Sequence, residues 1–204
     1  MVSTIAARVS AFIIDVISAM GYAGVVLLMA LESAGIPLPS EIIMPFSGYL
    51  ALTGRFTLRG AALAGAAGCV LGGLGAYWVA RVGGRSVLER YGRYLLISKH
   101  DLDVAERWFL RYADPVAFIG RLLPVIRTYI SFPAGMAGMD LRRFILYSFL
   151  GSWIWTYWLA WVGWKLGERW DSLRHTFEKF DVAIAVLLVA GAAWWVRRHL
   201  GRDS

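Results

Sequence analysis

The sequence has almost no cysteine, few histidines and little charge. Cys69 is the only cysteine among 204 residues, which excludes an intrachain disulfide, and it lies in an apolar run where a small packing residue is expected. The 3 histidines lie in polar or terminal segments without the spacing of metal ligands, so neither a metal nor a cofactor is predicted. Charged residues make up 17% of the chain, whereas soluble domains usually contain about 25%. This shortage argues against a soluble enzyme.

Apolar residues are abundant instead: they make up 58% of the chain, and its mean hydropathy is +0.57. Two uncharged runs, residues 60–80 and 144–164, are long enough to span a bilayer, which takes about 20 apolar residues. A third run, residues 182–196, is shorter and spans if Asp181 and Arg197 reach the two interfaces. Four glycines recur at helical spacing in the first run and predict close helix packing: Gly65, Gly68, Gly72 and Gly75. The chain is therefore predicted to be an integral membrane protein.

The region before the first long run is interrupted. Two short apolar arms, residues 21–31 and 42–53, flank a segment that contains two acids and two prolines: Glu32, Pro37, Pro39 and Glu41. As helix, each arm would measure about 16–18 Å, roughly half the thickness of the hydrocarbon core. The interruption predicts a re-entrant hairpin that enters the membrane and returns to the same side.

The same form recurs before the second long run. The arms at residues 112–120 and 128–139 flank the segment 121–127, which contains Arg121, Pro124 and Arg127, and Pro133 lies in the return arm. Proline discourages continuous helix. A second re-entrant hairpin is predicted here.

Basic residues cluster in three places, residues 81–111, 142–143 and 197–202. The basic residues that give the chain its net charge of +7 therefore flank apolar runs, and the charge does not indicate binding to nucleic acid. All three clusters fall on one face, predicted to be cytoplasmic, so the first hairpin enters from outside and the second from inside. Broken helices in inverted repeats are typical of transporters.

The predicted fold is thus an all-α, polytopic membrane protein with two inverted repeats, each a re-entrant hairpin followed by a transmembrane helix. One apolar stripe near the N-terminus, with Arg8 and Asp15 opposite, predicts an amphipathic helix on the membrane surface. The single membrane domain, residues 1–204, divides into this helix (1–20), the first hairpin and span (21–81), a cytoplasmic linker with a second amphipathic helix (82–111), the second hairpin and span (112–165) and a C-terminal span (180–198). The C-terminus is predicted to be cytoplasmic, and the side of the N-terminus is left open.

Four ionisable residues fall where a membrane should exclude them: Glu32, Glu41, Arg121 and Arg127. If the hairpin tips meet, carboxylates face guanidinium groups. Guanidinium suits phosphate because it forms paired hydrogen bonds and stays charged, and buried carboxylates can take up and release protons. The pattern predicts a site that binds a phosphorylated head group. Alternatively, the four residues are ion pairs that only hold the hairpins together, and Glu41 is an acid stabilised by a helix start.

Two motifs resemble those of a known family. Glu32-x4-Pro37-x-Pro39-Ser40-Glu41-x3-Pro45-x2-Gly48 resembles the first motif of the DedA family, whose domain is also called the VTT or SNARE-associated domain. Phe118-x2-Arg121-x2-Pro124-x2-Arg127, followed by Ala134-Gly135, Met139 and Phe144, resembles its second motif. The resemblance covers roughly residues 20–170. The residues expected to shape the hairpins are Pro37, Pro39, Pro45, Gly48, Pro124, Pro133 and Gly135.

The resemblance implies a multi-pass protein of the bacterial inner membrane that moves a phosphate-bearing lipid, such as undecaprenyl phosphate or phosphatidylethanolamine, as a flippase or scramblase. Family phenotypes that involve membrane potential suggest coupling to the proton motive force. Carried over by motif, Glu32 and Glu41 would couple protons, and Arg121 and Arg127 would bind the lipid phosphate. The expected partners are membrane lipids and protons, without nucleic acid, and a homo-oligomer is left open.

Other functions fit parts of the pattern. A proton-coupled antiporter of small solutes or ions, supporting membrane-potential homeostasis, would use the same carboxylates without phosphate-binding arginines. An intramembrane enzyme acting on lipid phosphate is not expected, because no histidine lies near the hydroxyl residues of the hairpins in the chain. A scaffold that transports nothing would use the four charges only for structure.

Overall fold

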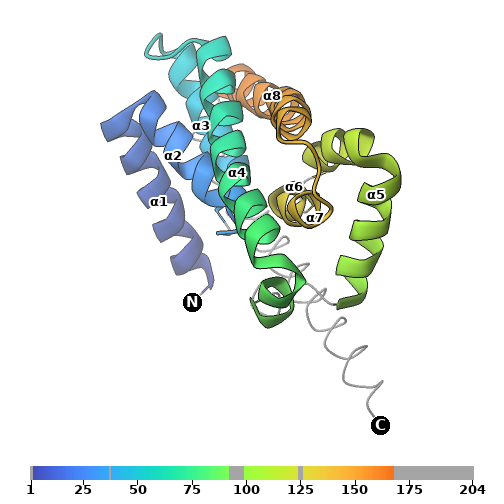
Figure 1. The fold of residues 1–204 in the computed structure, drawn as a ribbon. Helices are drawn as coiled ribbons and strands as arrows, with labels where there is room; N and C mark the ends of the chain where they lie inside the picture. The colour runs from blue at the N-terminus through green and yellow to red at the C-terminus, as the bar shows by residue number, and fades with distance from the viewer. Residues whose placement is uncertain (1, 37, 92–98, 124–125, 168–204) are drawn as a thin grey trace.

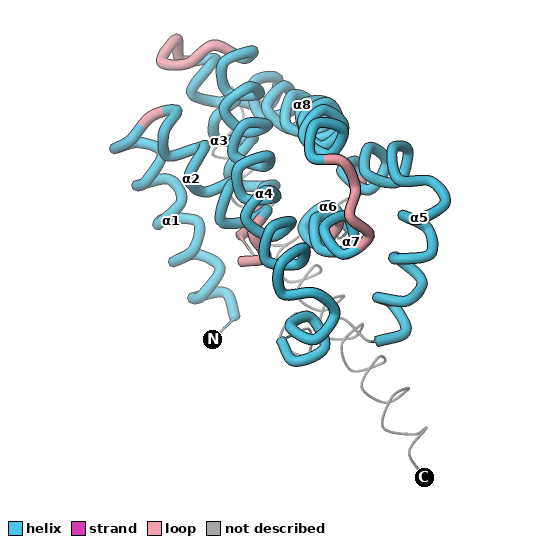
Figure 2. Tube along the Cα trace, in the orientation of Figure 1, coloured by secondary structure: helices cyan, strands magenta, loops and turns pink. Residues whose placement is uncertain are grey.

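The computed structural model describes residues 2–36, 38–91, 99–123 and 126–167, which form helices joined by loops, without a strand among them (Figure 2). The first half contains α1 (Val2–Met20), α2 (Tyr22–Ser33), α3 (Ser40–Leu52) and α4 (Leu58–Tyr91). The second half contains α5 (Lys99–Leu122), α6 (Ile126–Tyr129), α7 (Ser131–Met136) and α8 (Leu141–Leu166). The predicted C-terminal span, as well as Pro37 and Pro124, lies outside the described residues.

The first predicted hairpin is present as α2 and α3, which pack against each other. Gly21 takes a φ of 62° between α1 and α2, and Gly35 a φ of 108° after α2, both in the left-handed region that glycine adopts without strain. Pro39 precedes the first residue of α3 with a ψ of 104°, an extended conformation that sets the direction of the returning helix. The chain therefore reverses where the sequence predicts it.

The second hairpin is less regular than the first. Its first arm forms the end of α5, which kinks at Tyr112 (φ −141°, ψ 47°), three positions before Pro115 and at the predicted start of the arm. The return arm at residues 128–139 is not one helix, because it divides into α6, with 4 residues, and α7, with 6 residues. Pro133 lies in the first turn of α7, where a missing N–H costs little, and does not mark the break.

The two halves repeat one packing pattern (Figure 1). In each half, the first arm packs on the long helix that follows it: α2 on α4, and α5 on α8. The return arm packs on the long helix of the other half: α3 on α8, and α7 on α4. The long helices α4 and α8 also contact each other. Two related repeats would produce this reciprocal packing of each return arm on the other half. The opposite orientation of the repeats in a membrane stays a prediction.

Glycines allow these contacts to be close. A Cβ atom added to Gly72 of α4 would lie 1.9 Å from the carbonyl oxygen of Ala30 in α2. A Cβ atom on Gly48 of α3 would lie 1.9 Å from the carbonyl oxygen of Ala160 in α8. The predicted packing role holds for Gly65, Gly68 and Gly72, but it is wrong for Gly75, whose Cβ would meet nothing within 4 Å.

Within the described residues, one helical segment, Leu58–Gly83, is long and apolar enough to cross a membrane, with a mean hydropathy of 1.5. It contains the first predicted span. The second predicted span lies in α8, which has 26 residues but a composition rich in tryptophan and tyrosine that lowers its hydropathy.

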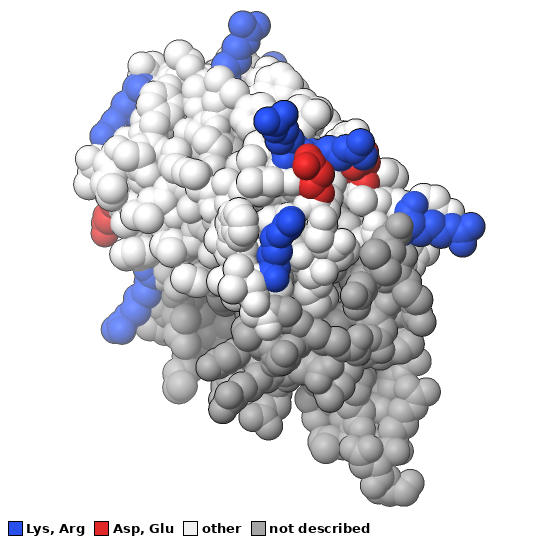
Figure 3. Space-filling view, viewed as in Figure 1, with Lys and Arg blue, Asp and Glu red and all other residues white. Residues whose placement is uncertain are grey.

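The N-terminal helix α1 has the predicted apolar stripe. Ile13 and Ile17 are completely buried, and α1 packs on α2 and α3, while Arg8 and Asp15 are exposed. The stripe therefore faces the bundle, and the position of α1 relative to a membrane surface stays a prediction. Charged side chains are sparse on the face of the molecule shown in Figure 3.

Candidate functional site

The tips of the two hairpins meet in a buried ion pair. Glu32 lies in the last turn of α2, and Arg127 lies in α6. Arg127 Nη2 donates a hydrogen bond of 2.5 Å to Glu32 Oε2, and the two side chains are only 4% and 7% exposed. The acidic first hairpin thus contacts the basic second hairpin, as the charge pattern predicts.

Arg121 joins the same two hairpins without a carboxylate partner among the described residues. Its Nη1 donates to Ser33 Oγ at 2.8 Å and to the carbonyl oxygen of Arg127 at 3.0 Å. Its Nη2 donates to Ser131 Oγ at 2.8 Å, and the residue is 2% exposed. These neutral acceptors hold the Arg121 guanidinium in place but leave its charge unbalanced.

Helix α4 contributes the thiol of Cys69 and, at Gly73, space for a guanidinium group. Arg127 Nη2 donates a hydrogen bond of 3.8 Å to Cys69 Sγ. A Cβ atom on Gly73 would lie 2.4 Å from Arg121 Nη2, so the guanidinium occupies the space that a side chain at position 73 would need. The sequence predicts Cys69 only as a packing residue and gives no signal that it borders a charge.

Helix α8 supports both guanidinium groups with aromatic rings. Arg127 Cζ lies 5.5 Å from the ring centroid of Trp155, and Arg121 Cζ lies 5.9 Å from that of Phe144, both within the range of cation–π attraction. Gly151 lies between these rings, and a Cβ there would lie 2.8 Å from Arg121 Cβ. Ser33, Ser131 and Trp155 have no predicted ligand role, because nothing in the linear sequence shows that they converge.

Glu41 stands apart from this group. It lies in the first turn of α3, its side chain is exposed, and Ser40 Oγ donates to its Oε2 at 3.2 Å. It interacts electrostatically with Glu32 and Arg127 but makes no ion pair with an arginine among the described residues. Its position suits an acid that is stabilised by a helix start.

Of the residues predicted to shape the hairpins, some lie at or within a helix of the hairpin and others lie at contacts between helices. Pro39 stands at the start of α3, whereas Pro45 lies inside α3 and cannot donate a helical hydrogen bond there. Gly135 of α7 packs on α4, where an added Cβ would lie 2.3 Å from the carbonyl oxygen of Tyr77. Gly135 thus shapes a helix contact and not a turn.

Three charged residues therefore form what we call the charged cluster: Glu32, Arg121 and Arg127. It contains two guanidinium groups and one carboxylate, so it carries an excess of one positive charge. An uncompensated buried charge is costly. The cluster is thus suited to binding an anion.

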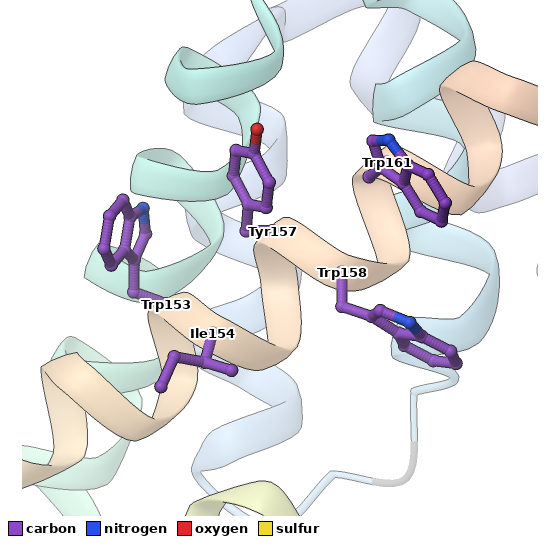
Figure 4. Close-up of a pocket in the computed structure, with 5 residues that line it drawn as sticks. All are labelled: Trp153, Ile154, Tyr157, Trp158 and Trp161. Carbon is purple, nitrogen blue, oxygen red and sulfur yellow. The ribbon is translucent and has the colours of Figure 1, made fainter.

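The opposite face of α8 is aromatic and exposed. Trp153, Ile154, Tyr157, Trp158 and Trp161 surround a pocket of about 390 Å³ (Figure 4). Figure 4 shows these side chains projecting outward from α8, and none of the residues that line the pocket is charged. Tryptophan and tyrosine are enriched at the membrane–water interfaces of membrane proteins.

Residues 38–165 match the family model of the VTT domain. The chain belongs to the VTT-domain family, which is the DedA family. The matched region contains Glu41, Arg121 and Arg127, and Glu32 lies just before it. The chain is therefore a membrane protein.

Relatives extend this family likeness over most of the chain. The chain is 36% identical over 170 residues to undecaprenyl phosphate transporter A of Bacillus subtilis, covering 83% of this chain and 84% of that protein. It is 27% identical over 194 residues to undecaprenyl phosphate transporter A of Staphylococcus aureus, covering 93% and 96%. An alkaline phosphatase-like protein of Lactococcus lactis is 34% identical over 181 residues, covering 86% and 85%. No solved structure matches the chain.

Proposed function

We propose that this VTT-domain protein moves a phosphate-bearing lipid of the undecaprenyl phosphate class across the bacterial inner membrane, coupled to protons. One observation carries the proposal: two arginines and a single carboxylate are buried together at the contact between the hairpins, and only Arg127 pairs with that carboxylate. The names of the Bacillus and Staphylococcus relatives support the choice of lipid.

The ion pair suggests how protons and lipid exchange. A lipid phosphate that binds Arg127 competes with Glu32 for the same guanidinium nitrogen. Glu32, once displaced, takes up a proton, because an unpaired charge is costly at that depth. Release of the lipid lets Glu32 lose the proton and bind Arg127 again. Arg121 keeps its positive charge throughout, because a guanidinium group stays protonated near neutral pH.

Lipid translocation in proteoliposomes tests the proposal. Fluorescent phosphatidylethanolamine and a polyprenyl phosphate would be compared, with and without a proton gradient, in the wild type, Arg127→Ala and Glu32→Gln. We expect gradient-sensitive movement of the polyprenyl phosphate in the wild type, loss of movement in Arg127→Ala and loss of the gradient response in Glu32→Gln.

Glu41→Gln is the matched control, because Glu41 is exposed and makes no ion pair with an arginine among the described residues. We expect it to keep the gradient response. Absence of lipid movement in the wild type would contradict the proposal. A solute-dependent proton flux that survives neutral replacement of both arginines would favour a small-solute antiporter.

A further inference from the structure

The charged cluster rests on one stripe of α8. The α8 stripe consists of residues at helical spacing on one side of the helix: Phe144, Ser148, Gly151, Ser152 and Trp155. Its rings lie against the two guanidinium groups, and its glycine contacts Arg121. Whatever binds between the arginines therefore meets the α8 stripe.

Hydrogen-bonding groups along this stripe remain unused. Across the described residues, four buried side-chain atoms have no hydrogen-bond partner, and three of them belong to this region: Arg121 Nε, Ser148 Oγ and Trp155 Nε1. Ser152, on the same stripe, is not among the unpaired groups. Buried polar groups are normally paired, so three unpaired ones around a single cluster call for a ligand.

The chemistry of the three groups selects that ligand. A guanidinium N–H and an indole N–H can only donate, and a serine hydroxyl can donate as well. The ligand must therefore be rich in acceptors, and the excess positive charge of the cluster requires an anion. A phosphate group meets both requirements, since its oxygens accept several hydrogen bonds.

We propose that Ser148 and Trp155 of α8 are neutral phosphate ligands, which complete with Arg121 Nε the head-group site that Arg127 opens. This assignment rests on the proposed function for the identity of the lipid but not for the binding of phosphate. It places the phosphate between α8 and the hairpins, so that both halves of the molecule bind the same group.

Binding of inorganic phosphate to the full chain in detergent tests the assignment without transport. With ¹⁵N-labelled tryptophan, the Trp155 indole N–H signal would be identified by its loss in Trp155→Phe. We expect phosphate, but not chloride at equal ionic strength, to shift this signal saturably. Ser148→Ala should raise the Kd about tenfold, as expected for loss of a hydrogen bond to a charged group. Ser148→Thr should keep the wild-type Kd.

Matched controls separate binding from packing. Ser47 is also buried, but its hydroxyl donates to the Ile43 carbonyl oxygen at 2.8 Å, so Ser47→Ala should leave the Kd unchanged. Trp153 is 38% exposed on the other face of α8 and its ring contacts Tyr157, so Trp153→Phe should also leave it unchanged. An indole signal of Trp155 that ignores phosphate, or an unchanged Kd in Ser148→Ala, would overturn the assignment.

Transport assays distinguish this inference from the proposed function. In proteoliposomes, Ser148→Ala and Trp155→Phe should raise the KM for a polyprenyl phosphate about tenfold, by the same loss of a charge-assisted hydrogen bond. A phosphate-dependent shift of Trp155 without lipid movement would refute the lipid transporter and leave the phosphate site standing. Lipid movement with an unchanged KM in both variants would refute the phosphate site and leave the lipid transporter standing.

Discussion

The two hairpins follow one packing plan but are held in place by different forces. In the first hairpin, α2 and α3 have 12 and 13 residues and dock on the long helices through glycine contacts. In the second hairpin, the return arm consists of α6 and α7, with 4 and 6 residues, which are too short to be stable helices alone. Besides the close contact of Gly135 with α4, its position depends on hydrogen bonds from Arg121 and Tyr77. The acidic hairpin is therefore the more regular of the two, and the basic hairpin depends more on polar contacts.

The largest effect is expected where the hairpins meet. Arg127→Ala leaves the Glu32 carboxylate buried without its partner, so the free energy of unfolding should fall by about 3–5 kcal/mol. Titration with sodium dodecyl sulfate in mixed micelles would measure the change.

Replacing both Glu32 and Arg127 separates the destabilisation caused by one unpaired buried charge from the net contribution of the ion pair to stability. With leucine at positions 32 and 127, no charge of the pair remains, and stability should return to within about 1 kcal/mol of the wild type. Lipid movement should still be absent. Full transport in this double variant would show that the pair only connects the hairpins.

Glycine contacts of the first hairpin should give the next largest effect. Alanine at position 72 would place its Cβ 1.9 Å from the Ala30 carbonyl oxygen, which forces α2 away from α4. Overpacking of this kind should cost about 1–3 kcal/mol. Gly75→Ala on the same helix meets nothing within 4 Å and should be neutral or slightly stabilising. Equal thermal midpoints of the two variants in detergent would contradict the assigned contact.

Local patterns in the sequence account for the hairpins and for half of the site. Prolines and charged residues that interrupt the apolar sequence predict the chain reversal after Ser33 and the arm that starts at Tyr112. The opposite charges of the two hairpins predict that Glu32 and Arg127 meet. The positions of α6 and α7 in the second hairpin are fixed by long-range contacts that no local pattern records. Ser33, Ser131 and Trp155 enter the site for the same reason: they reach the arginines from separate helices.

Removing a tyrosine hydroxyl should destabilise the second hairpin more than the first, although the loss of stability should be smaller than that caused by Gly72→Ala. Tyr77 of α4 donates a buried hydrogen bond of 2.5 Å to the Met139 carbonyl oxygen at the end of the second hairpin. Tyr77→Phe should lower the free energy of unfolding by about 1–2 kcal/mol, because the carbonyl loses its main partner. Tyr22 accepts a hydrogen bond of 2.8 Å from the Thr57 N–H at an exposed position of the first hairpin, where water can replace the phenol. Tyr22→Phe should therefore have little effect, and equal losses in the two variants would remove this distinction.

The smallest effect is expected at the start of α8, where the second hairpin ends. Asp140 accepts hydrogen bonds from the backbone N–H groups of Arg142 at 3.0 Å and Arg143 at 3.1 Å, so Asp140→Ala should cost about 1 kcal/mol, as the loss of a helix cap does. The nearby ion pair of Arg143 with Asp114 is 3.4 Å long, and the Arg143 side chain is 67% exposed. Arg143→Gln should therefore change stability by less than about 0.5 kcal/mol. If Arg143→Gln costs as much as Asp140→Ala in the same micelle titration, the ion pair contributes more than its exposure allows, and the second hairpin is fixed at its end by charge and not by the cap.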